Sequence, residues 1–197
     1  KMAIAAGIEM MPCGLIKVDG QTHFITRRFD RDGSHKLHIQ TLAALYPDAD
    51  SYEKLLMVCR KMRLSESAQE EVFRRMVFNI LANNTDDHNK NFSFLMGREG
   101  HWHAAPAYDL NFTVDLHGSQ LYHRHEFSMC GKDRNITRDD ILRFGENACI
   151  KSASSIIDDV EYAIRHFSNF AKDNGIDRRY VDEIGEYLLN RCGLFQS

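Results

Sequence analysis

The sequence predicts an α+β fold that is mainly α-helical and contains two small β-hairpins. Two pairs of alternating segments flank turn-forming residues, and several longer segments place apolar residues at helical spacing. The 197 residues suffice for one domain, or for a domain with a small appendage. Hydrophobic residues make up 43% and charged residues 27%, as in average globular proteins, which excludes disorder as the default state.

Charge and cysteine content restrict the class of protein further. The formal net charge is −3, which argues against a generally basic nucleic-acid-binding domain. No apolar run approaches the ~20 residues of a membrane span, so no membrane partner is expected. The five cysteines are scattered and none forms a C-x-x-C pair. That pattern is typical of reduced thiols, so we expect a cytoplasmic protein.

The first 30 residues are predicted to form a helix end and a β-hairpin. Residues 1–6 are predicted to be the last turns of a helix that ends at Gly7. Because this segment has no start signal, we expect the chain to begin inside a helix of a longer protein. Strands are predicted at 15–18 and 21–29, since Asp-Gly between them favours a two-residue type I′ turn.

Residues 31–197 are predicted to form a mostly helical body with the second hairpin in its middle. The strongest helical signal is residues 67–83, where a capping box at its start precedes a wide apolar stripe typical of a buried helix. The other helices are predicted at residues 36–46, at 51–62, from Thr137 onward, at 152–174 and at 177–192. The second hairpin is predicted over residues 92–105, and residues 112–135 are expected to be irregular.

The densest group of chemically reactive side chains lies in residues 83–91, between a predicted core helix and an apolar strand. Two carboxylates, an imidazole, an ammonium and four carboxamides occur there together, whereas an ordinary turn needs one or two such residues. A further carboxylate, Asp109, follows the second hairpin. Because a hairpin returns the chain to its starting edge, we expect Asp109 to lie beside the 83–91 loop.

This set of side chains suits phosphoryl transfer. That chemistry needs a carboxylate to orient the attacking hydroxyl, and oxygen ligands that hold Mg²⁺ against the phosphates. Asp86 and Asn91 are five residues apart, as are the Asp and Asn of the protein-kinase loop H-R-D-x-x-x-x-N. Asp109 is then placed like the second Mg²⁺ ligand, and His88 is placed to hydrogen-bond the transferred phosphate.

The same residues resemble the C-terminal lobe of the HipA family of bacterial serine/threonine kinases, which act as toxins of toxin–antitoxin modules. The resemblance rests on residues 84–94 and 105–109. Residues 26–31 are similar to the hinge strand of that family, and residues 5–8 to the end of the preceding helix. These matches occur in the same order as in the family and cover essentially the whole chain.

The resemblance implies a protein-kinase-like fold and an enzyme that uses ATP and Mg²⁺. The resemblance also implies that Asp86 is the catalytic residue and that Asn91 and Asp109 are the metal ligands. The residues that match positions around the nucleotide are His88, Asn89 and Lys90 at the phosphates, Arg27, Arg28 and Phe29 at the hinge, and Tyr108 before the metal Asp. On this basis residues 1–30 are a hinge-proximal unit and residues 31–197 the catalytic lobe.

The resemblance also implies partners and a cellular role. The expected partners are a protein substrate such as an aminoacyl-tRNA synthetase and a helix-turn-helix antitoxin, which brings operator DNA. The expected outcome is growth arrest and persistence. The phosphate-covering loop and ATP-anchoring Lys of the family have no counterpart in these residues, so we expect them in a longer protein or in a separate N-terminal-lobe chain.

Several alternatives stay open at the level of sequence. Asp87 is a second candidate for the catalytic carboxylate, although only Asp86 has the five-residue spacing to Asn91. The chain fits a degenerate lobe used as a binding or regulatory module, and the D-x-H-x-x-N run also resembles loops of lipid and small-molecule kinases. The pairs His101/His103 and His123/His125 are weak zinc candidates, and we expect them on a hairpin surface.

Overall fold

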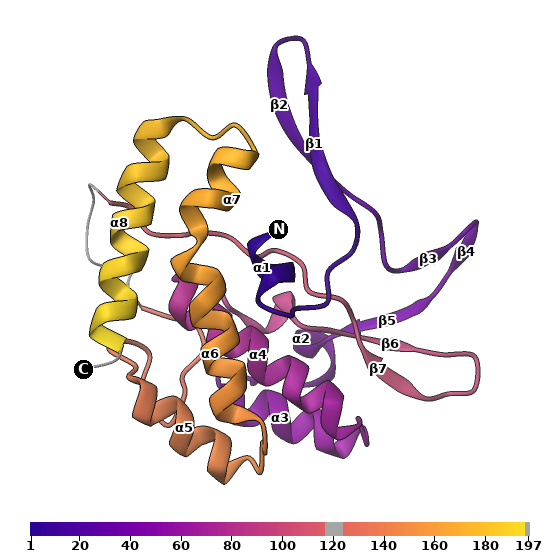
Figure 1. Cartoon of the computed structure of the whole chain (residues 1–197). Helices are drawn as coiled ribbons and strands as arrows, with labels where there is room; N and C mark the ends of the chain where they lie inside the picture. Colours follow the sequence, from indigo (N-terminus) through magenta and orange to yellow (C-terminus); the bar gives the residue numbers. More distant parts are fainter. Residues whose placement is uncertain (117–123, 196–197) are drawn as a thin grey trace.

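The structure, a computed structural model, describes residues 1–116 and 124–195. Helices α3 to α8 form one body, and strands β1 to β7 extend from one side of it (Figure 1). The expected mainly helical α+β fold is confirmed. The division into units at residue 30 stays a prediction.

The N-terminal helix end and hairpin form where predicted, but the second strand ends at Thr26 and does not extend to Phe29 as predicted. Helix α1 covers Met2–Ala5 and is followed by Gly7, whose φ is +81°. Strands β1 (Cys13–Val18) and β2 (Gln21–Thr26) pair antiparallel through a turn at Asp19 and Gly20. Both turn residues have positive φ, 49° and 78°, which a type I′ turn requires.

The helix predicted over residues 36–46 is wrong in its first half. A small hairpin, β3 (Arg31–Asp32) with β4 (His35–Lys36), comes first, and β5 (His38–Thr41) then pairs antiparallel with β6 (Ser93–Met96). Only α2 (Leu42–Leu45) is helical. Pairing with a strand more than 50 residues away overrides the local apolar pattern, as strand formation often does.

The second predicted hairpin is confirmed and joins a larger sheet. Strand β6 pairs with β7 (Trp102–Ala104), so the sheet has the order β5-β6-β7. Its inner end carries Ser93 and Phe94, which are buried against the helical body. The sheet therefore fixes the exit of the polar loop that precedes β6.

The buried central helix is α4 (Glu66–Ala82), which ends at Asn83 in the left-handed conformation. The buried apolar residues of its stripe are Val72, Phe73, Met76, Val77, Ile80 and Leu81. Helix α4 starts one residue earlier than predicted, because Ser65 caps it by accepting the hydrogen bond of Ala68 N at 3.2 Å. Helix α3 (Tyr52–Lys61) packs beside α4 and is capped by Ser51.

The remaining helices complete the body. They are α5 (Arg138–Asn147), α6 (Ala153–Arg165), α7 (Phe167–Asp173) and α8 (Arg178–Phe195). The single helix predicted over 152–174 is interrupted at His166, because its ring nitrogen Nδ1 lies 2.7 Å from the Tyr162 carbonyl oxygen. That oxygen is the regular acceptor of the His166 N–H, which bonds Ala163 O instead.

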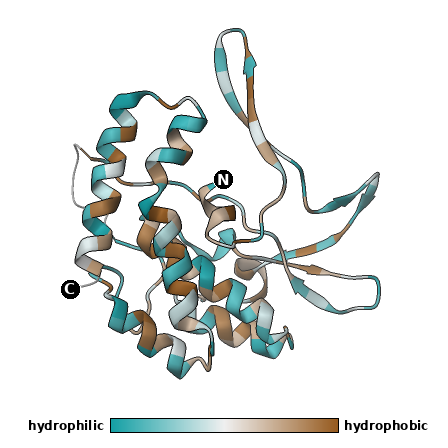
Figure 2. Cartoon of the chain, viewed as in Figure 1, coloured by the Kyte–Doolittle hydropathy of each residue, from teal (hydrophilic) through white to brown (hydrophobic). Residues whose placement is uncertain are grey.

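Hydropathy varies along the helices of the body. Helices α4 and α6, which pack against each other, both carry brown apolar residues among teal polar ones (Figure 2). Within residues 1–116 and 124–195, no helix combines the length and apolarity needed to cross a membrane. Hairpin β1–β2 extends away from the body, and its large apolar residues are exposed to solvent.

Candidate active site

The polar loop begins at the left-handed Asn83 and ends in a short 3₁₀ helix, η1 (Asn89–Asn91), before β6. Three of the links that hold it to the rest of the molecule are made by Thr85 and Asp87. Glu126 N donates to Thr85 O at 3.0 Å, and Thr85 N donates to Thr113 Oγ1 at 2.9 Å. The third link is Asp87, which anchors the loop in the core.

Asp87 is fully buried and accepts three hydrogen bonds. Its Oδ2 accepts from Tyr52 Oη at 2.5 Å and lies 3.0 Å from His125 Nδ1, while its Oδ1 accepts from Phe127 N at 3.2 Å. Tyr52 Oη also accepts from Asn79 Nδ2 at 3.2 Å. Burial and the Asp87 carboxylate raise the pKa of Tyr52 well above its ordinary value, so its proton stays in place.

Asp86, the neighbour of Asp87, faces the opposite way. Its side chain is 51% exposed, and its Oδ1 lies 3.5 Å from His88 Nε2. Its backbone carbonyl oxygen accepts from Asn91 Nδ2 at 2.9 Å, which joins the two residues of the five-residue spacing. Of the two candidate carboxylates, only Asp86 is therefore accessible to a substrate.

The second hairpin returns Asp109 to this loop through its neighbour Tyr108. Tyr108 Oη donates to Lys90 O at 2.6 Å and lies 2.5 Å from Ser93 Oγ. Burial raises the pKa of Tyr108. Asp109 itself is exposed, in the left-handed conformation with φ +55°, and its Oδ1 accepts from Asn111 Nδ2 at 2.7 Å.

The predicted hinge residues differ in what they contact. The ring of Phe29 is 5.4 Å from that of Tyr108, centre to centre, so it packs directly against the residue before Asp109. Arg28 forms two hydrogen bonds with Asp30, at 2.8 and 2.6 Å, which occupies its guanidinium locally. Arg27 is exposed, and its backbone N–H donates to Pro12 O at 2.9 Å.

The donor set suits a hard cation such as Mg²⁺. Asn91 uses its amide nitrogen on the loop backbone, so its Oδ1 is the atom that would act as an oxygen ligand. Asp109 has one carboxylate oxygen bound to Asn111 and one without such a bond. In the part of the chain that the structure describes, no three His, Cys, Asp or Glu side chains gather as a metal site. A site with few protein ligands is usual for Mg²⁺, which keeps waters and phosphate oxygens.

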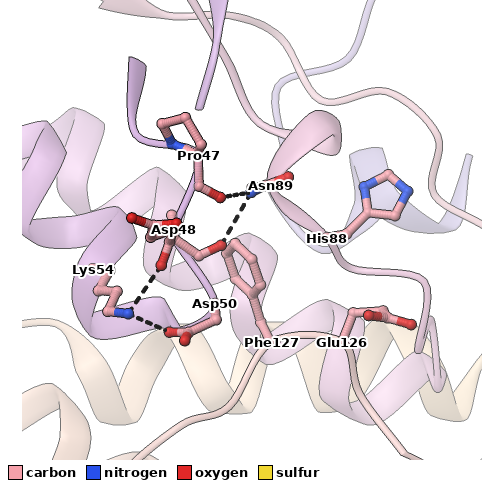
Figure 3. A pocket seen from close by; sticks show the side chains of 9 residues that line it. Pro47, Asp48, Asp50, Lys54, His88, Asn89, Glu126 and Phe127 are labelled. Carbon is pink, nitrogen blue, oxygen red and sulfur yellow. Dashed lines mark hydrogen bonds and ion pairs between the residues drawn. The ribbon is translucent and has the colours of Figure 1, made fainter. Parts of the chain in front are cut away.

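The side chains of the loop residues Asn89 and Lys90 differ in their contacts. Asn89 Nδ2 donates to Pro47 O at 2.9 Å and to Ala49 O at 3.2 Å, so its side chain points towards the 47–50 turn (Figure 3). Its expected place at the nucleotide phosphates stays a prediction. Lys90 is exposed and its ammonium makes no ion pair among the described residues.

Sequence reasoning missed the buried network beneath the loop. His125 was expected on a hairpin surface, but it is 3% exposed and faces Asp87, so that expectation is wrong. His123 lies outside the described residues. Nothing in the sequence pairs Tyr52, Asp87 and His125, because they come from three segments that meet only in the folded chain.

An exposed carboxylate, an adjacent carboxamide and a second carboxylate returned by a hairpin lie on one helical lobe. Comparison with solved structures shows that the fold of this lobe is kinase-like. The structure has a TM-score of 0.75 to HipA from Shewanella oneidensis, solved with HipB and operator DNA, at 18% identity. It has a TM-score of 0.63 to the Helicobacter pylori proinflammatory kinase CtkA, at 12% identity. Each match covers 98% of this chain.

The chain belongs to the family of HipA-like C-terminal domains, whose model matches residues 1–190. Two curated relatives carry the names "Putative kinase Y4dM", from Sinorhizobium fredii, and "Putative kinase", from Haemophilus influenzae. The first is 28% identical over 81% of this chain and the second 29% over 52%. The chain matches 40% and 36% of these relatives and 53% of the HipA structure, so it spans about half or less of each.

Proposed function

We propose that this chain is the catalytic lobe of an ATP- and Mg²⁺-dependent serine/threonine protein kinase of the HipA toxin type. The observation that carries the proposal is the opposed placement of Asp86 and Asp87. One is exposed next to Asn91 and near the Tyr108–Asp109 segment, and the other is buried as an anchor. A rigid loop that presents one carboxylate beside amide and carboxylate oxygens matches the needs of phosphoryl transfer.

In this proposal Asp86 accepts a hydrogen bond from the substrate hydroxyl, orients it and takes its proton as the phosphate is transferred. Asn91 Oδ1 and the Asp109 carboxylate hold Mg²⁺, which neutralises charge on the phosphates of ATP. His88 lies 3.5 Å from Asp86 and, with Lys90, stabilises negative charge that develops on the transferred group. The hinge at residues 27–29 holds adenine through its backbone groups.

Hairpin β1–β2 supports a second part of the proposal, the docking of an N-terminal lobe. Leu15 and Phe24 face each other across the strands and are 51% and 65% exposed. An isolated two-stranded hairpin is marginally stable in water, so this apolar pair fits a partner surface. We propose that the lobe with the ATP-anchoring Lys covers it, within the same polypeptide or as a separate chain.

The remaining partners are carried over from the family. We propose a helix-turn-helix antitoxin, operator DNA bound through it, and a protein substrate such as an aminoacyl-tRNA synthetase, with growth arrest and persistence as the result in the cytoplasm. The S. oneidensis complex of HipA, HipB and operator DNA supports the first two.

The activity is tested by transfer of labelled phosphate from ATP in the full-length protein. Asp86→Ala and Asp109→Ala should each abolish transfer, while circular dichroism and thermal unfolding show that the variants stay folded. Glu99→Gln, an exposed change on the β6–β7 turn, is the control. Retained activity in the Asp86 variant would overturn the assignment. If Mg²⁺–ATP does not raise the melting temperature of the wild type, the chain is a degenerate binding module instead.

A further inference from the structure

A surface pocket of about 370 Å³ lies beside the proposed catalytic loop (Figure 3). Apart from His88 and Asn89, its lining residues have no role in the site proposed above. Its walls come from the turn at residues 47–50 with Lys54 of α3, from His88 and Asn89 of the loop, and from Glu126 and Phe127. The pocket is therefore built where three segments far apart in sequence meet.

Hydrogen bonds hold these three segments in fixed positions. Asn89 Nδ2 joins the loop to the turn through the carbonyls of Pro47 and Ala49, at 2.9 and 3.2 Å. Ser128 N donates to Asp50 O at 3.0 Å, which joins the turn to the third segment. Glu126 N donates to Thr85 O at 3.0 Å and closes the ring of contacts. The walls are thus preformed, which lowers the entropy cost of binding.

The pocket has an acidic rim. Carboxylates of Asp48, Asp50 and Glu126 line it together with one ammonium, that of Lys54. Lys54 Nζ is 2.8 Å from Asp50 Oδ1 and 2.9 Å from Asp48 O, so its charge is already paired. Among the described residues, the carboxylates of Asp48 and Glu126 form no ion pair, and both residues are exposed. An entering cation therefore meets a rim with three carboxylates and one ammonium.

His88 links this pocket to the proposed reaction centre. It lines the pocket, and its Nε2 lies 3.5 Å from Asp86 Oδ1. Its Nδ1 is buried and has no hydrogen-bond partner among the described residues. An extended polypeptide advances about 3.3 Å per residue, so a serine at Asp86 places a side chain within about three residues of it over the pocket.

We propose that this pocket is a specificity site for a lysine or arginine side chain of the polypeptide substrate, near its phosphorylated serine. Asp48 and Glu126, on opposite sides of the pocket (Figure 3), supply the negative charge that attracts the cationic head, and Ala49 and Phe127 line the space that its alkyl stem occupies. The inference rests on the proposed kinase function and adds the substrate class to it.

The test uses serine peptides that carry a single Lys, Arg, Ala or Glu at each position on either side of the serine, phosphorylated by the full-length protein with labelled Mg²⁺–ATP. The wild type should prefer a basic residue at one position close to the serine. Asp48→Asn with Glu126→Gln should remove that preference, with a loss of about two- to fivefold in kcat/KM per carboxylate. Glu126→Lys should shift the preference towards Glu, and Glu99→Gln is the matched control.

The two ways of failing are distinct. If peptides are phosphorylated without any positional preference, or if the double variant keeps the basic preference, the pocket inference is refuted and the kinase function stands. If the wild type phosphorylates no peptide or protein with Mg²⁺–ATP, the proposed function fails and the inference falls with it. A preference that reverses with the charge at residue 126 supports both.

Discussion

Asp87, the buried anchor of the loop, is expected to contribute strongly to the stability of the domain. Asp87→Ala removes a carboxylate that serves three donors: the Tyr52 hydroxyl, His125 Nδ1 and the Phe127 N–H. Each buried donor left without a partner costs about 1–3 kcal/mol, so with partial relaxation the loss comes to about 3–6 kcal/mol. A domain is stable by only about 5–15 kcal/mol, so this change removes a large share of its stability.

The conservative variant is Asp87→Asn. The single oxygen of the new amide still accepts the hydrogen bond from the Phe127 N–H, because that group can only donate. The amide nitrogen therefore faces Tyr52 and His125. There it replaces an acceptor with a donor, and we expect a smaller loss of about 1–2 kcal/mol because both partners can reorient. Asp86→Asn is the matched control, since its side chain is half exposed, and should change the unfolding free energy by less than about 0.5 kcal/mol.

The assay is urea-induced unfolding of the full-length protein, followed by fluorescence and circular dichroism, with the free energy taken from the linear region. The expected order of stability is wild type, Asp86→Asn, Asp87→Asn and Asp87→Ala. If Asp87→Ala unfolds at the wild-type urea concentration while Asp86→Asn is strongly destabilised, the two carboxylates have been assigned the wrong way round.

Two further predictions concern the hinge region. Phe24→Ser should cost the full-length protein about 2 kcal/mol or more, as for a buried aromatic, if an N-terminal lobe covers hairpin β1–β2; an unchanged melting temperature means that the hairpin stays exposed. The hydrogen bond from Arg28 lowers the pKa of Asp30 to about 2, below its ordinary value of 3.8. The stability from this pair is therefore complete above about pH 4 and lost as the pH falls towards about 2. Because Arg28 is largely exposed, solvent screens this pair, and Arg28→Ala should flatten only part of the acid limb of a stability–pH curve.

Local signals in the sequence predicted the elements that local interactions determine. The turn at Asp19-Gly20 fixed the first hairpin, and the apolar stripe of α4 fixed the core helix. The strand His38–Thr41 was missed because its pairing partner is β6, far along the chain, and its apolar pattern also fits a helix. The break at His166 was missed because it depends on a side chain bonding a backbone carbonyl.

The candidate site was predictable in part for the same reason. The spacing between Asp86 and Asn91 is local, and in the structure the Asn91 amide does bond the Asp86 backbone. The return of Asp109 followed from hairpin geometry, and its neighbour Tyr108 makes the contact. The acceptors and donors around Asp87 come from separate segments, so only the folded chain distinguishes the anchoring carboxylate from the accessible one.

The alternation of Asp86 and Asp87 makes the loop sensitive to length as well as to composition. Removing or adding one residue between Asn83 and Asp86 would displace Asp87 from its three buried partners, although every side chain would still be present. Such a change would lose the anchor and the outward carboxylate in a single step. The polar loop is therefore constrained in length as well as in composition. We expect insertions to be tolerated at the β6–β7 turn instead.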